Sequence, residues 1–499
     1  MKLRVRKLFY LQMAEQNLKT KTTKGLFWGG ISNGGQQLLN LVFGIFLARL
    51  LTPSDYGLVG MLAIFSLIAT ALQESGFISA LNRKQDITQA DYNAVFWFNV
   101  FMGLSAYAVL FFCAPLIAAW FHQPILVPLA RLSFLSFVFS CFGTTPRAYL
   151  FRHLKVKETA YMTLIALTVS GVAGIILAWQ GFAYWGIAIQ NLIFCLLLTV
   201  LSWYYSGWRP SLRIDFSPLR SMIGFSVKLL LTNIFMHINN NIFSIFLGRW
   251  YGDRALGYYN QANKWTGIGY STLTGMVWNV TQPVFARITD DREQMQRAFC
   301  KMLRFTAFLA CPCMFGLALI APEFITIAIT EKWLPSAQLM QILCIGGAFV
   351  PVASLYANFL VSQGKSDIYM YNTIGLCLVQ LLLLYVLYPY GIRTMVVAYV
   401  VLNLLWLPVW HTFTSRLIGV SFFRAATDVA PFVLIAALSM GGAWWVAGFA
   451  ENIVAALLIK IAVAAMLYVG LMKLCKAVIL EECLDFLLRR NKNNTPFTP

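Results

Sequence analysis

Long apolar segments, separated by short polar ones, occupy nearly the whole chain. Within each segment apolar residues run on without the alternation typical of a barrel strand. Most segments hold about 20 residues, the length that a helix needs to cross a bilayer. Backbone groups in lipid must bond within their own segment, which favours helices. We therefore expect fourteen transmembrane helices, at residues 26–48, 58–81, 92–119, 128–146, 160–179, 184–205, 221–247, 262–285, 303–329, 337–361, 369–389, 394–414, 429–449 and 453–473.

The composition identifies the solvent of these helices. Of 499 residues, 59% are hydrophobic and 11% are charged, against about 25% charged in a soluble domain. A soluble core cannot bury so much apolar surface, so the fold class is an all-α polytopic membrane protein. The ten cysteines lie mostly inside predicted spans, where a thiol acts as a small hydrophobe. We expect no disulfide framework, no metal site and no cofactor.

The basic residues are distributed unevenly between the two sides of the predicted bundle. With the N-terminus in the cytoplasm, inside segments hold 29 Lys and Arg residues and outside segments hold six. This bias is the positive-inside pattern, and it predicts that the tails at 1–25 and 474–499 are both cytoplasmic. Residues 1–25 are basic and show no secretory signal pattern. The net charge of +19 leaves no basic patch that would indicate nucleic acid.

An internal repeat with an offset of 200 residues links the two halves of the chain. Six of the ten residues in 40–49 recur in 240–249, and Asn33 and Gly57 recur as Asn233 and Gly257. Six is an even number of spans, so two six-helix halves would share one topology, and transporters built in this way place their pathway between the halves. We expect an N-lobe at 26–205, a cytoplasmic linker at 206–220, a C-lobe at 221–414 and an extra helix pair at 429–473.

The repeated spans carry polar faces. Residues three, four and seven apart share one side of a helix, and unpaired polar groups in hydrocarbon are costly. Two such faces predict a hydrated cavity, while hydrogen bonding between helices is the alternative, and for His237 a structural role is as good an explanation. The residues concerned are Asn33, Gln36, Gln37, Asn40, Asn233, His237 and Asn240.

Five cations lie within or at the ends of the spans, where ionisable residues tend to be functional. They are Lys228, Lys264, Arg49, Arg249 and Arg131. Such groups suit a diphosphate, which Arg and Lys bind through charge-assisted hydrogen bonds. The alternative for both lysines is a side chain that reaches the interface. The alternative for Arg49 and Arg249 is an interface anchor or a contact with a carboxylate such as Asp55.

Glu74 is the deepest acid of the second span. It is a candidate for an ion pair with one of the cations or for binding a coupling ion.

Several short motifs carry a resemblance to a known family. They are Leu47–Gly57 (LARLLTPSDYG), Tyr92–Trp97 (YNAVFW), Trp208–Pro210 (WRP), Leu256–Asn260 (LGYYN) and Gln363–Asp367 (QGKSD). With these motifs, the chain from about residue 22 to 430 resembles the polysaccharide transporter family. These are the Wzx-type flippases of the superfamily that includes the MATE drug exporters and the lipid II flippase, and the resemblance is closest to the colanic-acid-exporter-like branch.

This resemblance implies two lobes around a cationic cavity that opens alternately to each side of a bacterial inner membrane. The implied cargo is an undecaprenyl-diphosphate-linked oligosaccharide, moved from the cytoplasmic to the periplasmic leaflet for O-antigen, capsule or exopolysaccharide synthesis. Membrane lipids, a polymerase and export machinery are the implied partners. The family motifs lie at helix ends and turns and supply no catalytic residues, so we do not expect an enzyme.

Two other classes were weighed against this expectation. A cation-coupled MATE-like exporter of small molecules would favour intramembrane carboxylates, whereas cations and amides dominate here. A membrane glycosyltransferase or polymerase would need a large extramembrane loop or an acidic catalytic motif, and the chain has no Walker lysine motif for ATP hydrolysis. The sequence alone does not exclude a channel or a scaffold protein.

Overall fold

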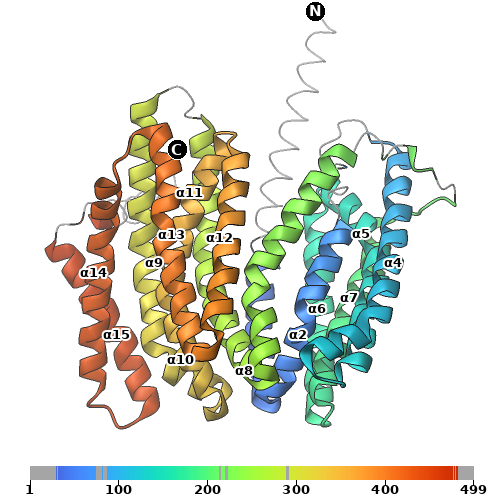
Figure 1. Ribbon diagram of the computed structural model, residues 1–499, viewed down its shortest axis with the longest axis horizontal. Helices are drawn as coiled ribbons and strands as arrows, with labels where there is room; N and C mark the ends of the chain where they lie inside the picture. The colour runs from blue at the N-terminus through green and yellow to red at the C-terminus, as the bar shows by residue number, and fades with distance from the viewer. Residues whose placement is uncertain are drawn as a thin grey trace, which may run out of the picture. The chain divides into compact units, whose positions relative to one another are not determined.

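The computed structural model shows an all-helical membrane protein (Figure 1). Among the residues that it describes, regular structure is α-helix with short 3₁₀ turns. Contacts divide the chain into two compact units, residues 1–257 and 258–499. The lobe boundary predicted at 206–220 is a different division and stays a prediction. The described residues are 28, 30, 32–74, 81, 87–212, 215–217, 219, 223–287, 291–475, 477 and 479–481.

The first unit is a bundle in which α5 and α7 each pack against several other helices. α4 packs on α5, α5 on α7, and α6 on α7, while α2 contacts α4, α5 and α7. The short connections make α4 antiparallel to α5 and α6 antiparallel to α7. The helices are one at residues 32–50, then α2 (Pro53–Glu74), α4 (Gln89–Phe121), α5 (Leu126–Arg152), α6 (Val156–Trp179), α7 (Ala183–Ser206) and the first part of α8 (Ile223–Arg287).

Local sequence signals set both ends of α4. Thr88 and Asp91 form a capping box, which satisfies backbone N–H groups that the first turn leaves free. At the other end His122 has a left-handed backbone with φ of 54°. Its N–H and that of Gln123 bond to carbonyls of the last turn, which closes the helix. This ending places the His122 ring at the end of the first unit that the charge bias predicts to be periplasmic, called the outer end below.

The second unit packs around α9. α10, α14 and α15 each contact α9, and α14 and α15 pack on each other at one edge of this unit (Figure 1). An aromatic core of Phe285, Phe299, Tyr356 and Phe359 holds α8, α9 and α11 together. The helices after α8 are α9 (Arg292–Ile329), η2 (Glu331–Trp333), α10 (Leu334–Gly347), α11 (Val350–Ser362), α12 (Ser366–Leu387), η3 (Tyr388–Tyr390), α13 (Ile392–Ile418), α14 (Phe422–Ala447) and α15 (Ile453–Leu474).

The structure changes the helix boundaries at two places. α8 contains two of the predicted spans and bends at Gly252, whose φ of 79° and ψ of −177° are not helical. The span predicted at 337–361 is divided into α10 and α11, because the ring of Pro351 takes away one backbone donor. The described part of every predicted span is otherwise helical over nearly its full length.

The outward surface of both units is apolar, as a lipid solvent requires. Phe112 on α4 is 77% exposed, and Leu405 on α13 and Leu438 on α14 are each 67% exposed. Within the described residues, 11 helices are long and apolar enough to cross a membrane. The helix at 32–50 and α8 are not among these 11, and they carry the predicted polar faces. The chain is thus a multi-pass membrane protein.

Candidate functional site

The predicted polar face of the first helix is exposed over its first half. Asn33, Gln37 and Asn40 are exposed, and half-buried Gln36 donates a hydrogen bond from Nε2 to Ser32 Oγ at 2.9 Å. The contact between Gln36 and Ser32 stays within one helix. The choice between a hydrated cavity and pairing between helices stays a prediction for the exposed amides.

The direction of this face follows from the turn of about 100° per residue in an α-helix. Asn33, Gln37 and Asn40 share an angular sector with Phe43 and Leu47 in the second half of the helix, and these two are buried. The side that packs against protein near the outer end therefore continues as exposed amides near the inner end. The exposed apolar side chains of this helix, Leu38, Val42 and Phe46, lie roughly opposite. The amides thus lie on the same side of the helix as its buried residues.

Several predicted site residues fall on segments whose side chains the structure does not describe. Lys228, Asn233 and Asn240 lie on α8, and Glu74 is the last residue of α2; their side chains are outside the described part. His237 on α8 is half-buried, and its carbonyl accepts a hydrogen bond from Asn241 Nδ2 at 2.9 Å. The polar face of α8 accordingly stays a prediction.

Lys264 lies on the second part of α8 and is half-buried. Its Nζ is 5.6 Å from the centroid of the Trp265 ring, and no carboxylate of the described residues forms an ion pair with it. One turn earlier, Gln261 is 1% exposed, and both polar atoms of its amide lack a hydrogen-bond partner among the described residues. Lys264 thus has a ring contact and no ion pair within the described part of the chain, and its role in binding an anion stays a prediction.

Arg131 and Arg249 are held by aromatic rings near the outer end. The Cζ of Arg131 lies 4.3 Å from the centroid of the Phe111 ring, and that of Arg249 lies 5.2 Å from the Trp120 ring. Arg249 Nη1 also donates to His122 Nε2 at 3.0 Å. Cation–π contacts of this kind stabilise a charged side chain by about 0.5–2 kcal/mol. These contacts support the alternative of an interface anchor for Arg249.

Arg49 ends the first helix and is exposed. Asp55, the carboxylate considered as its partner, accepts hydrogen bonds from the backbone N–H and the hydroxyl of Thr52, at 2.8 and 2.7 Å. These bonds cap the N-terminus of α2, so the carboxylate of Asp55 has a local role.

A close crossing of α2 and α8 lies at the outer end of the first unit. A Cβ on Gly57 would lie 1.8 Å from the carbonyl oxygen of Asp253, and a Cβ on Gly257 would lie 1.8 Å from the carbonyl oxygen of Pro53. The two contacts are reciprocal and keep the offset of 200 that the repeat shows. The Ser54 hydroxyl also bonds to the Asp253 carboxylate. The repeated segments are therefore related by a local two-fold axis, and only glycine fits at both positions.

The sequence alone indicates the glycine pair at the α2–α8 crossing, but it does not indicate the backbone contacts there or the buried Gln261. The match of Gly57 with Gly257 is visible as an identity in the repeat, but the backbone contact is a tertiary property. Gln261 was missed because it falls at the start of a predicted span, where a polar residue is ordinary.

A polytopic helical bundle with an internal two-fold relation is the architecture of many membrane transporters. The fold is that of known transporters. It superposes on the lipid II flippase MurJ in its inward closed conformation with a TM-score of 0.74, covering 92% of this chain and 99% of that chain at 14% identity. A multidrug resistance MATE family transporter of the MOP superfamily gives 0.62, covering 77% and 94% at 18% identity.

Sequence comparison identifies the family. The family model described as "Polysaccharide biosynthesis protein" matches residues 46–338, more than half of the chain. The chain belongs to this family. An uncharacterized membrane protein in the cps region of Klebsiella pneumoniae is 26% identical over 70% of this chain and 73% of its own length. The lipopolysaccharide biosynthesis protein WzxC of Escherichia coli strain K12 is 25% identical over 70% and 72%. The teichuronic acid biosynthesis protein TuaB of Bacillus subtilis strain 168 is 23% identical over 71% and 74%.

Proposed function

We propose that this protein is a flippase for an undecaprenyl-diphosphate-linked oligosaccharide. The observation that carries the proposal is the exposed amide surface of Asn33, Gln37 and Asn40 on the same side of the first helix as its buried residues. Amides donate and accept hydrogen bonds, so they can replace water around sugar hydroxyls. The family match and the relatives in polysaccharide biosynthesis support a sugar cargo.

The cargo joins a polar head to a long apolar tail, and each part needs its own surroundings. The diphosphate would meet Lys264, whose ammonium has no carboxylate partner among the described residues; Lys228 is a second candidate. Charge-assisted hydrogen bonds to phosphate are roughly twice as strong as neutral ones. The tail would remain in lipid, against the apolar outer surface, while the head moves.

Transport by alternating access requires that the outer end of the protein open and close. The α2–α8 crossing at Gly57 and Gly257 would close this end in one state and separate in the other. The Ser54–Asp253 hydrogen bond would fasten the closed state. The cargo can shift the equilibrium between the open and the closed state only as far as its affinities for these two states differ.

The proposed setting is a bacterial inner membrane with both termini in the cytoplasm, as the distribution of basic residues predicts. The cargo would pass from the cytoplasmic to the periplasmic leaflet, where a polymerase and export machinery would use it. No chemical reaction is part of this proposal, since movement of the cargo changes none of its bonds.

Replacement of the amides tests the proposal. In a strain that depends on this protein, Gln37→Leu with Asn40→Leu should lower the amount of lipid-linked oligosaccharide at the periplasmic face by at least about tenfold. That factor corresponds to about 1.4 kcal/mol of lost interaction. The matched control is Phe46→Leu on the apolar side of the same helix, which should keep full export.

Two outcomes would contradict the proposal. Full export by the double variant, at normal protein level, would remove the amide surface from the pathway. Efflux of cationic dyes with no effect on the oligosaccharide would instead indicate a MATE-like exporter of small molecules.

A further inference from the structure

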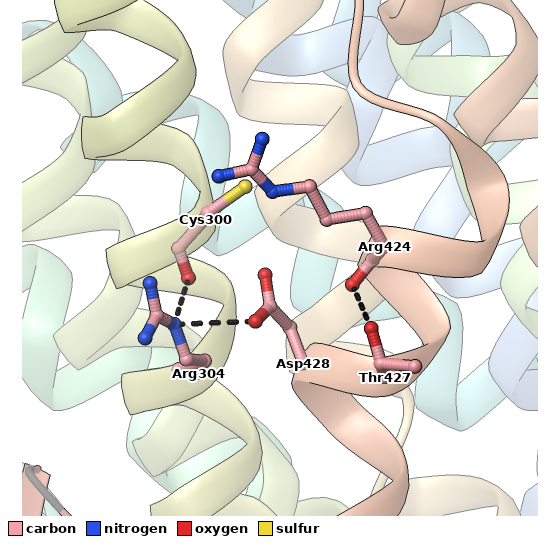
Figure 2. A network of polar contacts seen from close by, with 5 residues as sticks. All are labelled: Cys300, Arg304, Arg424, Thr427 and Asp428. Atoms are coloured by element: carbon pink, nitrogen blue, oxygen red, sulfur yellow. Dashed lines mark hydrogen bonds and ion pairs between the residues drawn. The ribbon is translucent and has the colours of Figure 1, made fainter.

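A polar network joins α9 to the first turns of α14 (Figure 2). Arg304 Nε lies 3.4 Å from Asp428 Oδ1 and donates to the carbonyl of Cys300, also at 3.4 Å. Arg424 lies one turn before Asp428, and its carbonyl accepts a hydrogen bond from the Thr427 hydroxyl. In Figure 2 the guanidinium of Arg424 extends toward the Cys300 thiol, and no dashed contact ends on it.

The charges in this network do not balance. Arg304 and Arg424 supply two guanidinium groups, and Asp428 supplies one carboxylate. The guanidinium of Arg424 makes no ion pair with the residues that the structure describes. The seam between the two helices therefore carries a surplus of positive charge.

Helix stability does not explain Arg424. It lies in the first turn of α14, where the positive end of the helix dipole disfavours a cation by about 0.3–1 kcal/mol. No acidic residue in that turn offsets the cost. At the start of α9, in contrast, Asp291 and Glu293 accompany Arg292. A cation that lowers the stability of its own helix is expected to have another partner.

The depth of the network indicates what that partner is. The predicted membrane boundaries of these helices, residues 303 and 429, fall beside Arg304 and Asp428. With these predicted boundaries, we expect Arg424 about one turn outside the hydrocarbon, at the level of lipid head groups. The neighbouring Phe423 is 82% exposed and Phe422 is 48% exposed, so apolar rings border the cations on the lipid side. Basic groups at this depth are those that bind anionic lipid head groups.

We propose that the seam between α9 and α14 binds the phosphate of an anionic phospholipid such as phosphatidylglycerol. Arg424 contributes its guanidinium to this phosphate, and Arg304 shares its charge between the phosphate and Asp428. Phe422 and Phe423 lie against the acyl chains. The inference is independent of the proposed cargo, because it concerns a resident lipid of the membrane surface.

Lipid binding to the purified full-length protein tests the inference. Native mass spectrometry would measure the dissociation constant for phosphatidylglycerol and for the neutral phosphatidylcholine. Arg424→Ala should weaken phosphatidylglycerol binding about fivefold, from about 1 kcal/mol per basic residue at a charged membrane surface. Phosphatidylcholine binding should not change. Arg424→Lys should retain most of the affinity, and Arg393→Ala, at the opposite end of α13, is the matched control.

Asp428→Asn is expected to change the affinity for phosphatidylglycerol in the opposite direction. Removal of the carboxylate frees Arg304, so the affinity for phosphatidylglycerol should rise by a similar factor. Equal affinities for wild type, Arg424→Ala and Asp428→Asn would overturn the inference. So would a loss that is seen with a polyprenyl diphosphate and not with phosphatidylglycerol, because the seam would then serve the transported lipid.

Discussion

Gly57 and Gly257 show how a single atom can decide the approach of two helices. A methyl group at either position would overlap a backbone oxygen, and a backbone atom cannot turn aside as a side chain can. The pair also explains why the repeat keeps glycine at both sites. Each glycine accommodates the carbonyl of the residue four positions before its repeat partner.

Replacement of Lys264 is the most direct single-residue test of the transport proposal. Lys264→Ala should reduce export at least about tenfold while the amount of protein in the membrane stays the same, because its ammonium has no carboxylate partner in the described part of the chain. A phosphate contact of this kind contributes about 1.5–3 kcal/mol. Pulse-labelled surface polysaccharide in a deletion strain measures the effect.

Lys264→Arg serves as the control, since it keeps the charge. Full export by Lys264→Ala would show that this side chain plays no part in binding the cargo.

At the residue scale the sequence predicts polarity better than it predicts partners. The spacing of Asn33, Gln37 and Asn40 predicted a common face, and the structure exposes all three. The contacts of Arg131 with Phe111 and of Arg249 with Trp120 were not predicted. The rings come from another helix, so no local pattern records these contacts.

At the scale of helices, a buried ion pair connects α15 to the rest of the second unit. Lys460 Nζ lies 2.6 Å from Glu323 Oε1 on α9 and 3.2 Å from the carbonyl of Leu319. The two side chains are 9% and 16% exposed. Breaking one side of a buried pair leaves an unpaired charge and costs roughly 3–5 kcal/mol.

Lys460→Met should therefore lower the free energy of unfolding by roughly 3–5 kcal/mol. Thermal unfolding in detergent, followed by tryptophan fluorescence, would measure the loss. The double variant Lys460→Met with Glu323→Gln should recover most of it, because no charge is left without a partner. If the double variant is as unstable as the single one, the pair does not provide the attachment of α15.

The helices themselves were largely predictable, and their interruptions were not. The described part of each predicted span is helical, because long apolar runs have one stable solution in lipid. The bend at Gly252 and the break before Pro351 are set by the packing of neighbouring helices, which a pattern of apolar residues does not record. Proline occurs inside several other helices here, including α4 and α13, without dividing them.

At the scale of the whole molecule, the α2–α8 crossing would have to part in every transport cycle. A disulfide between Ser54→Cys and Asp253→Cys, whose side chains are in contact, should therefore stop export when oxidised. Reduction should restore export. Surface polysaccharide measured before and after treatment with a reductant follows the change.

The single cysteine variants control for the protein's own thiols. Normal export by the fully cross-linked protein would mean that α2 and α8 stay together throughout the cycle.

The polarity of the first helix also bears on how the chain enters the membrane. Residues 32–50 are not among the helices apolar enough to qualify as spans by themselves, whereas α2 and α4 are. Partitioning from the translocon into lipid follows the apolar character of a segment. We expect the first helix to remain in the translocon until α2 has been synthesised. The two helices would then enter the lipid as a pair, and membrane insertion of the first helix would depend on its contact with α2.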